Sequence, residues 1–132
     1  MNRIDVKITD INTSGGVILV DMEANSCPMS ALLIDIADNP DWLKRGNTLK
    51  VVFKETEVSI AKNLSGNISL RNKLPCIVKE IERGKLLSVV VLDFKGKTIR
   101  AAITSRSVDF LELQPGNEVL ALIKANELAL MQ

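Results

Sequence analysis

Short apolar runs rich in β-branched residues, separated by polar turn residues, make up the second half of the chain. Runs of this kind are typical of β-strands. The sequence FKGKT, between the second and third runs, supplies the glycine of a tight hairpin. We therefore expect five strands in this half, over residues 74–82, 86–94, 97–104, 118–125 and 127–131.

One segment, SRSVDFLEL at 105–113, departs from the strand pattern. Serines stand at its head and apolar residues follow, which predicts one short helical turn capped by Ser105 or Ser107. The next residues, QPGN, predict a turn. Five short strands with one helical insertion, within about 65 residues, indicate a small barrel of the oligonucleotide-binding (OB) type.

The first half of the chain repeats the second when the sequence is shifted by 70 positions. Residues 31–60 then overlie residues 101–130 without a gap. A Gly-Asn pair and a Lys-x-x-Glu pattern coincide within a shared apolar pattern, which favours duplication over chance. The identical pairs include Gly46/Gly116, Asn47/Asn117, Lys54/Lys124 and Glu57/Glu127.

The repeat predicts the architecture of the whole chain as all-β, with two tandem small OB-like five-stranded β-barrels. The first and more diverged barrel is expected over 1–64 and the second over 65–132. In the first, Pro40 favours a loop where the second has its helical turn. Small barrels leave sheet edges and apolar patches exposed, so we expect the two barrels to pack against each other. Whether linker residues 63–72 add a strand to the neighbouring barrel is left open. The strands expected in the first copy lie near 4–12, 16–23, 28–34, 48–54 and 57–62.

Composition excludes several classes of function. The 17 basic residues nearly balance the 16 acidic ones and aromatics make up 3%, whereas nucleic-acid binders show a basic excess and stacking rings. No apolar run is long enough to cross a membrane, and the start MNRIDVKITD lacks the apolar stretch of a secretory signal. Cys27 and Cys76 lie in unlike contexts, which favours reduced thiols over a disulfide and hence a cytoplasmic protein.

Catalysis is also disfavoured, because the chain contains no histidine. Histidine is the usual general base near neutral pH and the commonest transition-metal ligand. No acidic residues have the grouped spacing that binds Ca²⁺ or Mg²⁺. We therefore expect a binding protein and not an enzyme, with no metal held directly by side chains.

The junction between the copies carries polar groups suited to an oxyanion. Ser69 and Asn72 offer neutral donors around Arg71, whose guanidinium is a fixed fork of N–H groups. Lys124 stands at a strand end and adds a compact positive charge. Ser105 and Ser107 offer further hydroxyl groups. These residues also have plainer interpretations: Arg71 as a solvated linker residue, Lys124 as a lysine that screens a sheet edge, and the two serines as helix caps. The residues by themselves leave an anion site as one hypothesis for a β-barrel repeat.

Residues 68–130 carry a family resemblance. The opening Ser69-Leu70-Arg71-Asn72, the segments AITSRSV and LQPGNEV, and the strand ALIKA are similar to the molbindin, or Mop/TOBE, family of molybdate-binding domains. With a diverged first copy, the chain resembles a tandem di-Mop protein. It also looks like the C-terminal regulatory region of molybdate-importer ATPase subunits.

The resemblance implies that molybdate or tungstate is bound where barrels meet, within a homodimer or higher homo-oligomer. From the opening motif, the resemblance implies contacts by the Ser69 and Arg71 side chains and the Leu70 main chain. It implies a further contact by Ser107 of AITSRSV, and contacts by the Lys124 side chain and the Ala125 main chain of ALIKA. Asn72 is expected to hold the turn rather than to touch the ion. The residues implied as oxyanion ligands are Ser69, Leu70, Arg71, Ser107, Lys124 and Ala125.

The first copy departs from this pattern. Its register has no Ser-x-Arg before Asn2, and Ala37 stands where the second copy has Ser107. Only Lys54 survives, so we expect fewer ions per chain than in a symmetric protein. The function expected is cytoplasmic storage, homeostasis or sensing of the oxyanion. The alternatives are a regulatory domain of a molybdate-importer ATPase subunit or of a molybdate-responsive transcription regulator, and an interaction barrel without a ligand.

Overall fold

The computed structural model describes residues 1–34 and 40–132, and it consists of two five-stranded antiparallel sheets. The all-β fold class is confirmed, with α1 (Ser105–Phe110) as the only α-helix among the described residues. The predicted loop around Pro40 lies mostly outside these ranges. The first sheet has the order β10-β4-β1-β2-β3, with β1 Asn2–Ser14, β2 Val17–Ala24, β3 Cys27–Ile34, β4 Thr48–Phe53 and β10 Ala129–Met131. The second has the order β5-β9-β6-β7-β8, with β5 Ser59–Ala61, β6 Asn72–Glu82, β7 Leu87–Phe94, β8 Lys97–Thr104 and β9 Glu118–Ile123.

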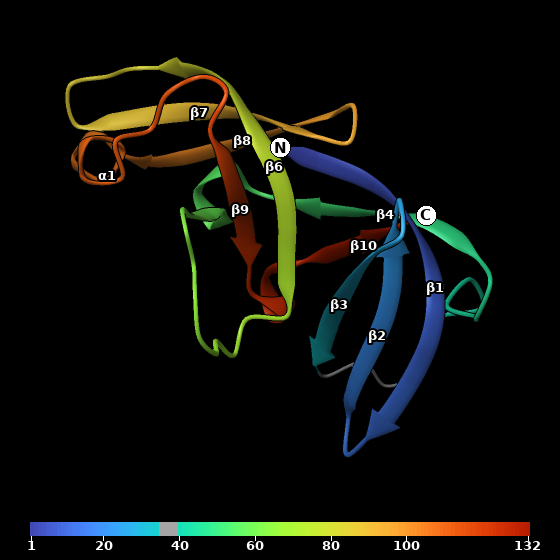
Figure 1. Cartoon of the computed structure of the whole chain (residues 1–132). Helices are drawn as coiled ribbons and strands as arrows, with labels where there is room; N and C mark the ends of the chain where they lie inside the picture. The colour runs from blue at the N-terminus through green and yellow to red at the C-terminus, as the bar shows by residue number, and fades with distance from the viewer. Residues whose placement is uncertain (35–39) are drawn as a thin grey trace.

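Each sheet takes its fifth strand from the other half of the chain. β10 pairs with β4 through Leu130 and Val51, and β5 pairs with β9 through Ile60 and Ala121. In Figure 1, β10 runs from the second half across to β4. Our prediction that each copy supplies all five of its strands was therefore wrong. Both copies carry the same strand pattern. The sequence therefore does not show whether a strand joins the sheet of its own half or the sheet of the other half. The division at 64/65 stays a prediction.

The two sheets follow the 70-residue repeat in detail. Each has a bulge in its first long strand, between Ile8 and Asp10 in β1 and at the equivalent place in β6. The Gly-Asn pair fixes the turn before β4 and β9. The Gly46 N–H donates to the Ile8 carbonyl at 2.9 Å, and the Gly116 N–H donates to the Val78 carbonyl at 2.8 Å. Both glycines have a φ near +90°, which favours glycine at these positions.

The Lys-x-x-Glu pattern forms a second repeated feature, a single 3₁₀ turn. These turns, η1 (Glu55–Glu57) and η2 (Ala125–Glu127), each follow a long strand and precede the exchanged one. In both, the glutamate N–H donates to the carbonyl of the lysine three residues earlier. In η1 the Glu57 carboxylate also accepts from the Lys54 N–H at 2.8 Å. The pattern therefore redirects the chain from one sheet to the other.

Apolar side chains from both sheets form one continuous core. Phe53 of the first half and Phe94 of the second are both buried within it. Burying large apolar side chains is the main stabilising contribution to a fold of this size. The halves therefore fold as one unit, with β1 against β8 and β3 against β6.

Two buried asparagines join the halves by reciprocal hydrogen bonds. Asn72 donates from Nδ2 to the carbonyls of Ser30 (2.9 Å) and Ile123 (3.0 Å), and its Oδ1 accepts from the Ser30 N–H at 2.7 Å. Asn2, the equivalent residue, bonds the N–H and carbonyl of Arg100 in the same way, at 2.8 and 2.9 Å. Since Ser30 and Arg100 are also 70 positions apart, the contacts form a pseudo-twofold pair. Asn72 therefore has a structural role, but as a bridge between strands and not in holding a turn, as we had expected.

The short helix is capped differently from our prediction. Thr104, the last residue of β8, is the N-cap, and its hydroxyl accepts from the Ser107 N–H at 3.1 Å. Ser105 is the first helical residue and is buried, with its hydroxyl bonded to Ser88 and to the Gly84 carbonyl. The prediction was wrong by one position, because Thr104 is still extended and its side chain reaches the helix first.

The two cysteines are free thiols in the core. Burial raises the pKa of Cys76 to about 12 from the usual 9.0, and it raises the pKa of Cys27 as well. Both thiols therefore stay protonated in the folded protein at neutral pH. Among the described residues, no helix is long and apolar enough to cross a bilayer.

Replacing Asn72 by alanine should lower the free energy of unfolding by about 3 kcal/mol, since it leaves buried main-chain groups of β3 and β9 without partners. Urea denaturation followed by circular dichroism measures the change. Asn12→Ala is the control, because the Asn12 side chain is exposed and makes one long bond of 3.5 Å to Asp10. Equal stabilities of the two variants would contradict the proposed role of Asn72.

The buried thiol also predicts how stability depends on pH. The folded pKa of Cys76 lies above the unfolded value, so the stabilisation is complete below pH 9.0 and is lost as pH rises toward 12. The free energy of unfolding should fall by about 1 kcal/mol per pH unit above pH 9 from this group. Urea titrations from pH 8 to 10.5 test this, with Cys76→Ala as the comparison. An equal slope in the variant would contradict the assignment.

Candidate functional site

A cavity of about 570 Å³ lies between the junction segment, η2 and β3. It contains five of the six residues predicted as oxyanion ligands. Two cationic side chains, one hydroxyl and one amide contribute to its wall, and two apolar residues come from the first half. The lining residues are Leu32, Ile34, Ser69, Leu70, Arg71, Lys124, Ala125 and Asn126.

Strand pairing explains why residues distant in sequence meet here. Asn72, the first residue of β6, pairs with Ile123, the last residue of β9. Arg71 and Lys124 are the next residues outward, so the two cations extend from the same end of neighbouring strands. The Asn72 side chain fixes this end of β6 through its bonds to Ser30 and Ile123.

The charges at the cavity are not neutralised by the protein. None of the ion pairs among the described residues involves Arg71 or Lys124, and both residues are exposed. No carboxylate is present among the described lining residues. A guanidinium, an ammonium and the Ser69 hydroxyl are all donors, so the arrangement is suited to a small anion whose atoms are all acceptors.

Ser107, the sixth predicted ligand, is not among the residues that line this cavity. It lies on α1, where its Oγ is 2.8 Å from the Thr104 Oγ1. The equivalent position in the first half, Ala37, lies outside the described residues. Within one chain the structure therefore gathers the junction residues with Lys124 and Ala125, and leaves Ser107 apart.

Sequence reasoning missed three lining residues, namely Leu32, Ile34 and Asn126. Leu32 and Ile34 belong to β3 of the first half and reach the cavity because β3 lies against η2 and β6. In the sequence they are ordinary strand residues, so only the packing of the two halves identifies them. Asn126 follows Ala125 in the 3₁₀ turn η2. Its position directly after ALIKA is the sequence signal from which it could have been predicted.

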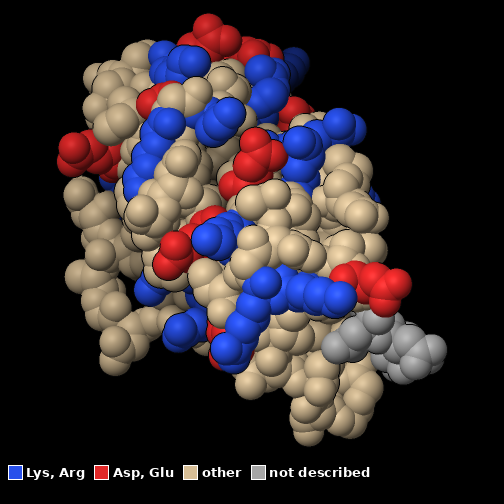
Figure 2. Space-filling view, turned by 90° about the vertical axis from the view of Figure 1, so that its right-hand side faces the viewer, with Lys and Arg blue, Asp and Glu red and all other residues tan. Residues whose placement is uncertain are grey.

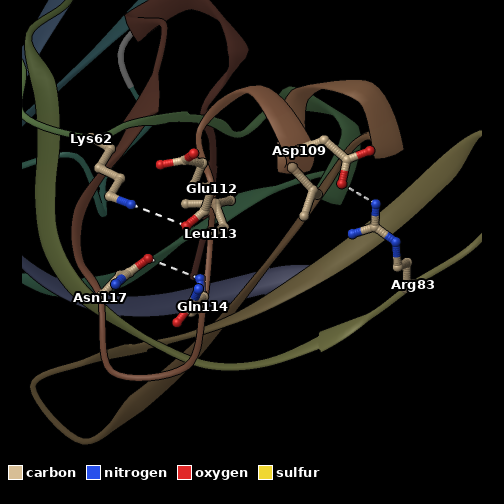
Figure 3. Close-up of a pocket in the computed structure, with 8 residues that line it drawn as sticks. Lys62, Arg83, Asp109, Glu112, Leu113, Gln114 and Asn117 are labelled. Atoms are coloured by element: carbon tan, nitrogen blue, oxygen red, sulfur yellow. Dashed lines mark hydrogen bonds and ion pairs between the residues drawn. The ribbon is translucent and has the colours of Figure 1, made fainter.

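A second polar cavity, near α1, has both of its cationic side chains already bound to acceptors of the protein. Lys62 donates from Nζ to the carbonyls of Leu111 (3.0 Å) and Glu112 (3.1 Å), and Arg83 forms an ion pair with Asp109. Figure 3 shows Lys62 directed toward the Glu112 carbonyl and Arg83 directed toward Asp109. A ligand anion here would have to displace internal partners, so this cavity is a weaker candidate.

The charge pattern of one face of the molecule argues against a polyanionic ligand there. Figure 2 shows one face of the molecule on which basic and acidic side chains are interspersed. The formal net charge is +1. A polyanion needs a continuous basic stripe, which this face does not offer.

Comparison with known proteins places the chain in a family. A domain model described as "TOBE domain" matches residues 68–130. A molybdate-binding protein from Sporomusa ovata is 46% identical, and its solved structure aligns over 51% of this chain and 100% of its own length, with a TM-score of 0.50. The chain belongs to the molbindin (Mop/TOBE) family.

Two further similar proteins extend the comparison. A crystal structure of the cytoplasmic molybdate-binding protein ModG, with molybdate bound, aligns with a TM-score of 0.92 at 26% identity and covers 98% of this chain and 94% of its own. The tandem OB-like arrangement is thus confirmed over nearly the full length. The molybdenum import ATP-binding protein ModC of Brucella abortus is 43% identical over 84 residues, 63% of this chain. The chain spans about a quarter of that relative, 23% of its length.

Proposed function

We propose that this molbindin binds molybdate or tungstate in the cavity at Arg71 and serves in cytoplasmic storage, homeostasis or sensing of the ion, without catalysing a reaction. The observation that carries the proposal is the meeting of Arg71, Lys124 and Ser69 in one cavity that contains no described carboxylate. The likeness to ModG, solved with molybdate bound, supports the same ligand class.

The binding mechanism follows from the chemistry of the ion. Molybdate at neutral pH is a tetrahedral dianion whose four oxygens accept hydrogen bonds. Arg71 offers a two-pronged fork to one edge of the tetrahedron, and the Lys124 ammonium offers a compact charge. Main-chain N–H groups of Leu70 and Ala125, with the Ser69 hydroxyl, complete the donor set. Sulfate carries the same charge, so the size of the cavity provides the discrimination.

We further propose that Ser107 reaches the ion from a second copy of the chain, in a homodimer or higher homo-oligomer. Exposed apolar residues beside both parts of the site support this arrangement. Phe110, on the same helix as Ser107, is 84% exposed, and Ile34, at the cavity, is 57% exposed. Covering such residues favours association. Ion bound between copies would stabilise the assembly, which suits a storage or sensing protein.

A second candidate function is a regulatory domain of a molybdate-importer ATPase subunit. The 43% identity to the Brucella ModC protein over 84 residues favours it. In that role the same cavity would bind the ion and transmit its occupancy to a transporter subunit. A regulatory domain of a molybdate-responsive transcription regulator is the other alternative. Both use the oxyanion site described above.

Replacing Arg71 by alanine should weaken molybdate binding about 100-fold, since hydrogen bonds to a charged group contribute about 1.5–3 kcal/mol each. Arg71→Lys should lie between the two, because it keeps the charge and loses the fork. Isothermal titration with molybdate, tungstate and sulfate measures the affinities. Arg45→Ala is the matched control, because it makes the same change of charge at an exposed ion pair with Asp10 in the first half. An Arg71→Ala protein that binds as tightly as the unmodified chain would refute the site.

Mixing two defective chains tests whether Ser107 comes from a second copy. Arg71→Ala and Ser107→Ala should each bind weakly alone. If each site combines Arg71 of one chain with Ser107 of another, co-refolded mixtures should regain tight binding at part of their sites. Equilibrium dialysis combined with native mass spectrometry measures occupancy and subunit number together. A mixture that binds no better than its components, or a monomer with full affinity, would contradict the shared site.

A further inference from the structure

The 70-residue repeat creates a second position equivalent to the Arg71 cavity, on the other side of the pseudo-twofold axis. Lys54 there corresponds to Lys124, and η1 corresponds to η2. The residue equivalent to Ala125 is Glu55, so a carboxylate stands where the cavity has a methyl group. β8 packs against η1 just as β3 packs against η2.

The Glu55 carboxylate is bound to a guanidinium at this position. Its Oε1 accepts from Nε of Arg100, on β8, at 3.1 Å. The Arg100 Nη2 group donates to both carboxylate oxygens of Glu82, at 2.8 and 2.9 Å. The Glu82 and Glu55 carboxylates raise the pKa of Arg100, Glu82 having the larger effect.

Arg100 is held in place independently of its charged partners. Its N–H and carbonyl both bond the side chain of the buried Asn2, which is the equivalent of Asn72. The corresponding residue of the first half, Ser30, bonds the side chain of Asn72, the residue that follows Arg71. Arg100 therefore supplies a guanidinium near the place where the missing Ser-x-Arg motif would have supplied one.

We propose that the Glu55 carboxylate is a built-in anion that fills the second oxyanion position of the chain. The inference rests on the proposed function of the Arg71 cavity and gives a physical reason for the expectation that the chain binds fewer ions than a symmetric protein. An oxyanion at this place would meet a fixed negative charge and an arginine whose Nε–H is already used. With Glu55 removed, the freed Arg100 Nε–H and the Lys54 ammonium would face a tetrahedral dianion, while the Arg100 Nη2 group stays paired with Glu82.

The test removes Glu55 in a chain whose first site has been disabled. Arg71→Ala should bind molybdate weakly, and the double variant Arg71→Ala/Glu55→Ala should regain about one ion per chain, at least tenfold tighter than Arg71→Ala. Arg71→Ala/Glu82→Ala is the matched control, because it also takes a carboxylate from Arg100 but leaves Glu55 in place. It should bind no better than Arg71→Ala. Equilibrium dialysis with molybdenum measured by mass spectrometry gives the stoichiometry.

Glu55→Gln keeps the side-chain length and an oxygen for the Arg100 Nε–H, so it guards against misfolding of the alanine variant. It too should raise binding in the Arg71→Ala background. If neither Glu55 variant binds more than Arg71→Ala, the inference is overturned. Failure of the proposed function has a different signature: the unmodified chain and Arg71→Ala would bind equally. Gain of binding in the Glu55 variants would then still support the second position.

Discussion

The bonds of two buried asparagines hold the two halves of this molecule in one fixed relation. Asn72 spans β3, β6 and β9 at once, and Asn2 makes the equivalent contact with β8. Because unsatisfied main-chain groups are costly in a core, these side chains allow little variation in how the halves meet. The wall of the cavity at Arg71 is built from both halves, so its shape depends on this relation. The exchange of β5 and β10 reinforces it.

Duplication followed by divergence explains how one fold holds two equivalent positions with different chemistry. The two sheets, their bulges, their Gly-Asn turns and their 3₁₀ turns coincide after a shift of 70 residues. The chemistry at the two equivalent positions does not. Ala125 leaves room beside Lys124, whereas Glu55 beside Lys54 pairs with Arg100. Besides Glu55, the first copy lacks the Ser-x-Arg motif, and Arg100 stands at the position equivalent to Ser30. These differences together place an internal carboxylate where we propose that the other copy binds an external anion.

The sequence was sufficient to predict the strands, the repeat and five residues that share the cavity. These features have local signals, such as β-branched runs, the Gly-Asn turn and the Ser-x-Arg-Asn motif. The exchange of strands had no local signal in the sequence, because the two copies have the same strand pattern and a strand of one copy fits either sheet. Leu32 and Ile34 had none either, since their role depends on the packing of β3 against the other half. The helix cap was misplaced by one residue, because Thr104 and the two serines that follow it are all capping residues.

The central claim is that the cavity at Arg71 and Lys124 holds a tetrahedral dianion. Anomalous diffraction from a crystal soaked in tungstate tests it most directly, because the heavy atom marks its own position. The account predicts a tungsten peak in the cavity, with the Arg71 guanidinium and the Lys124 ammonium within hydrogen-bond distance of its oxygens. An Arg71 side chain directed into solvent, with no tungsten beside it, would contradict the account.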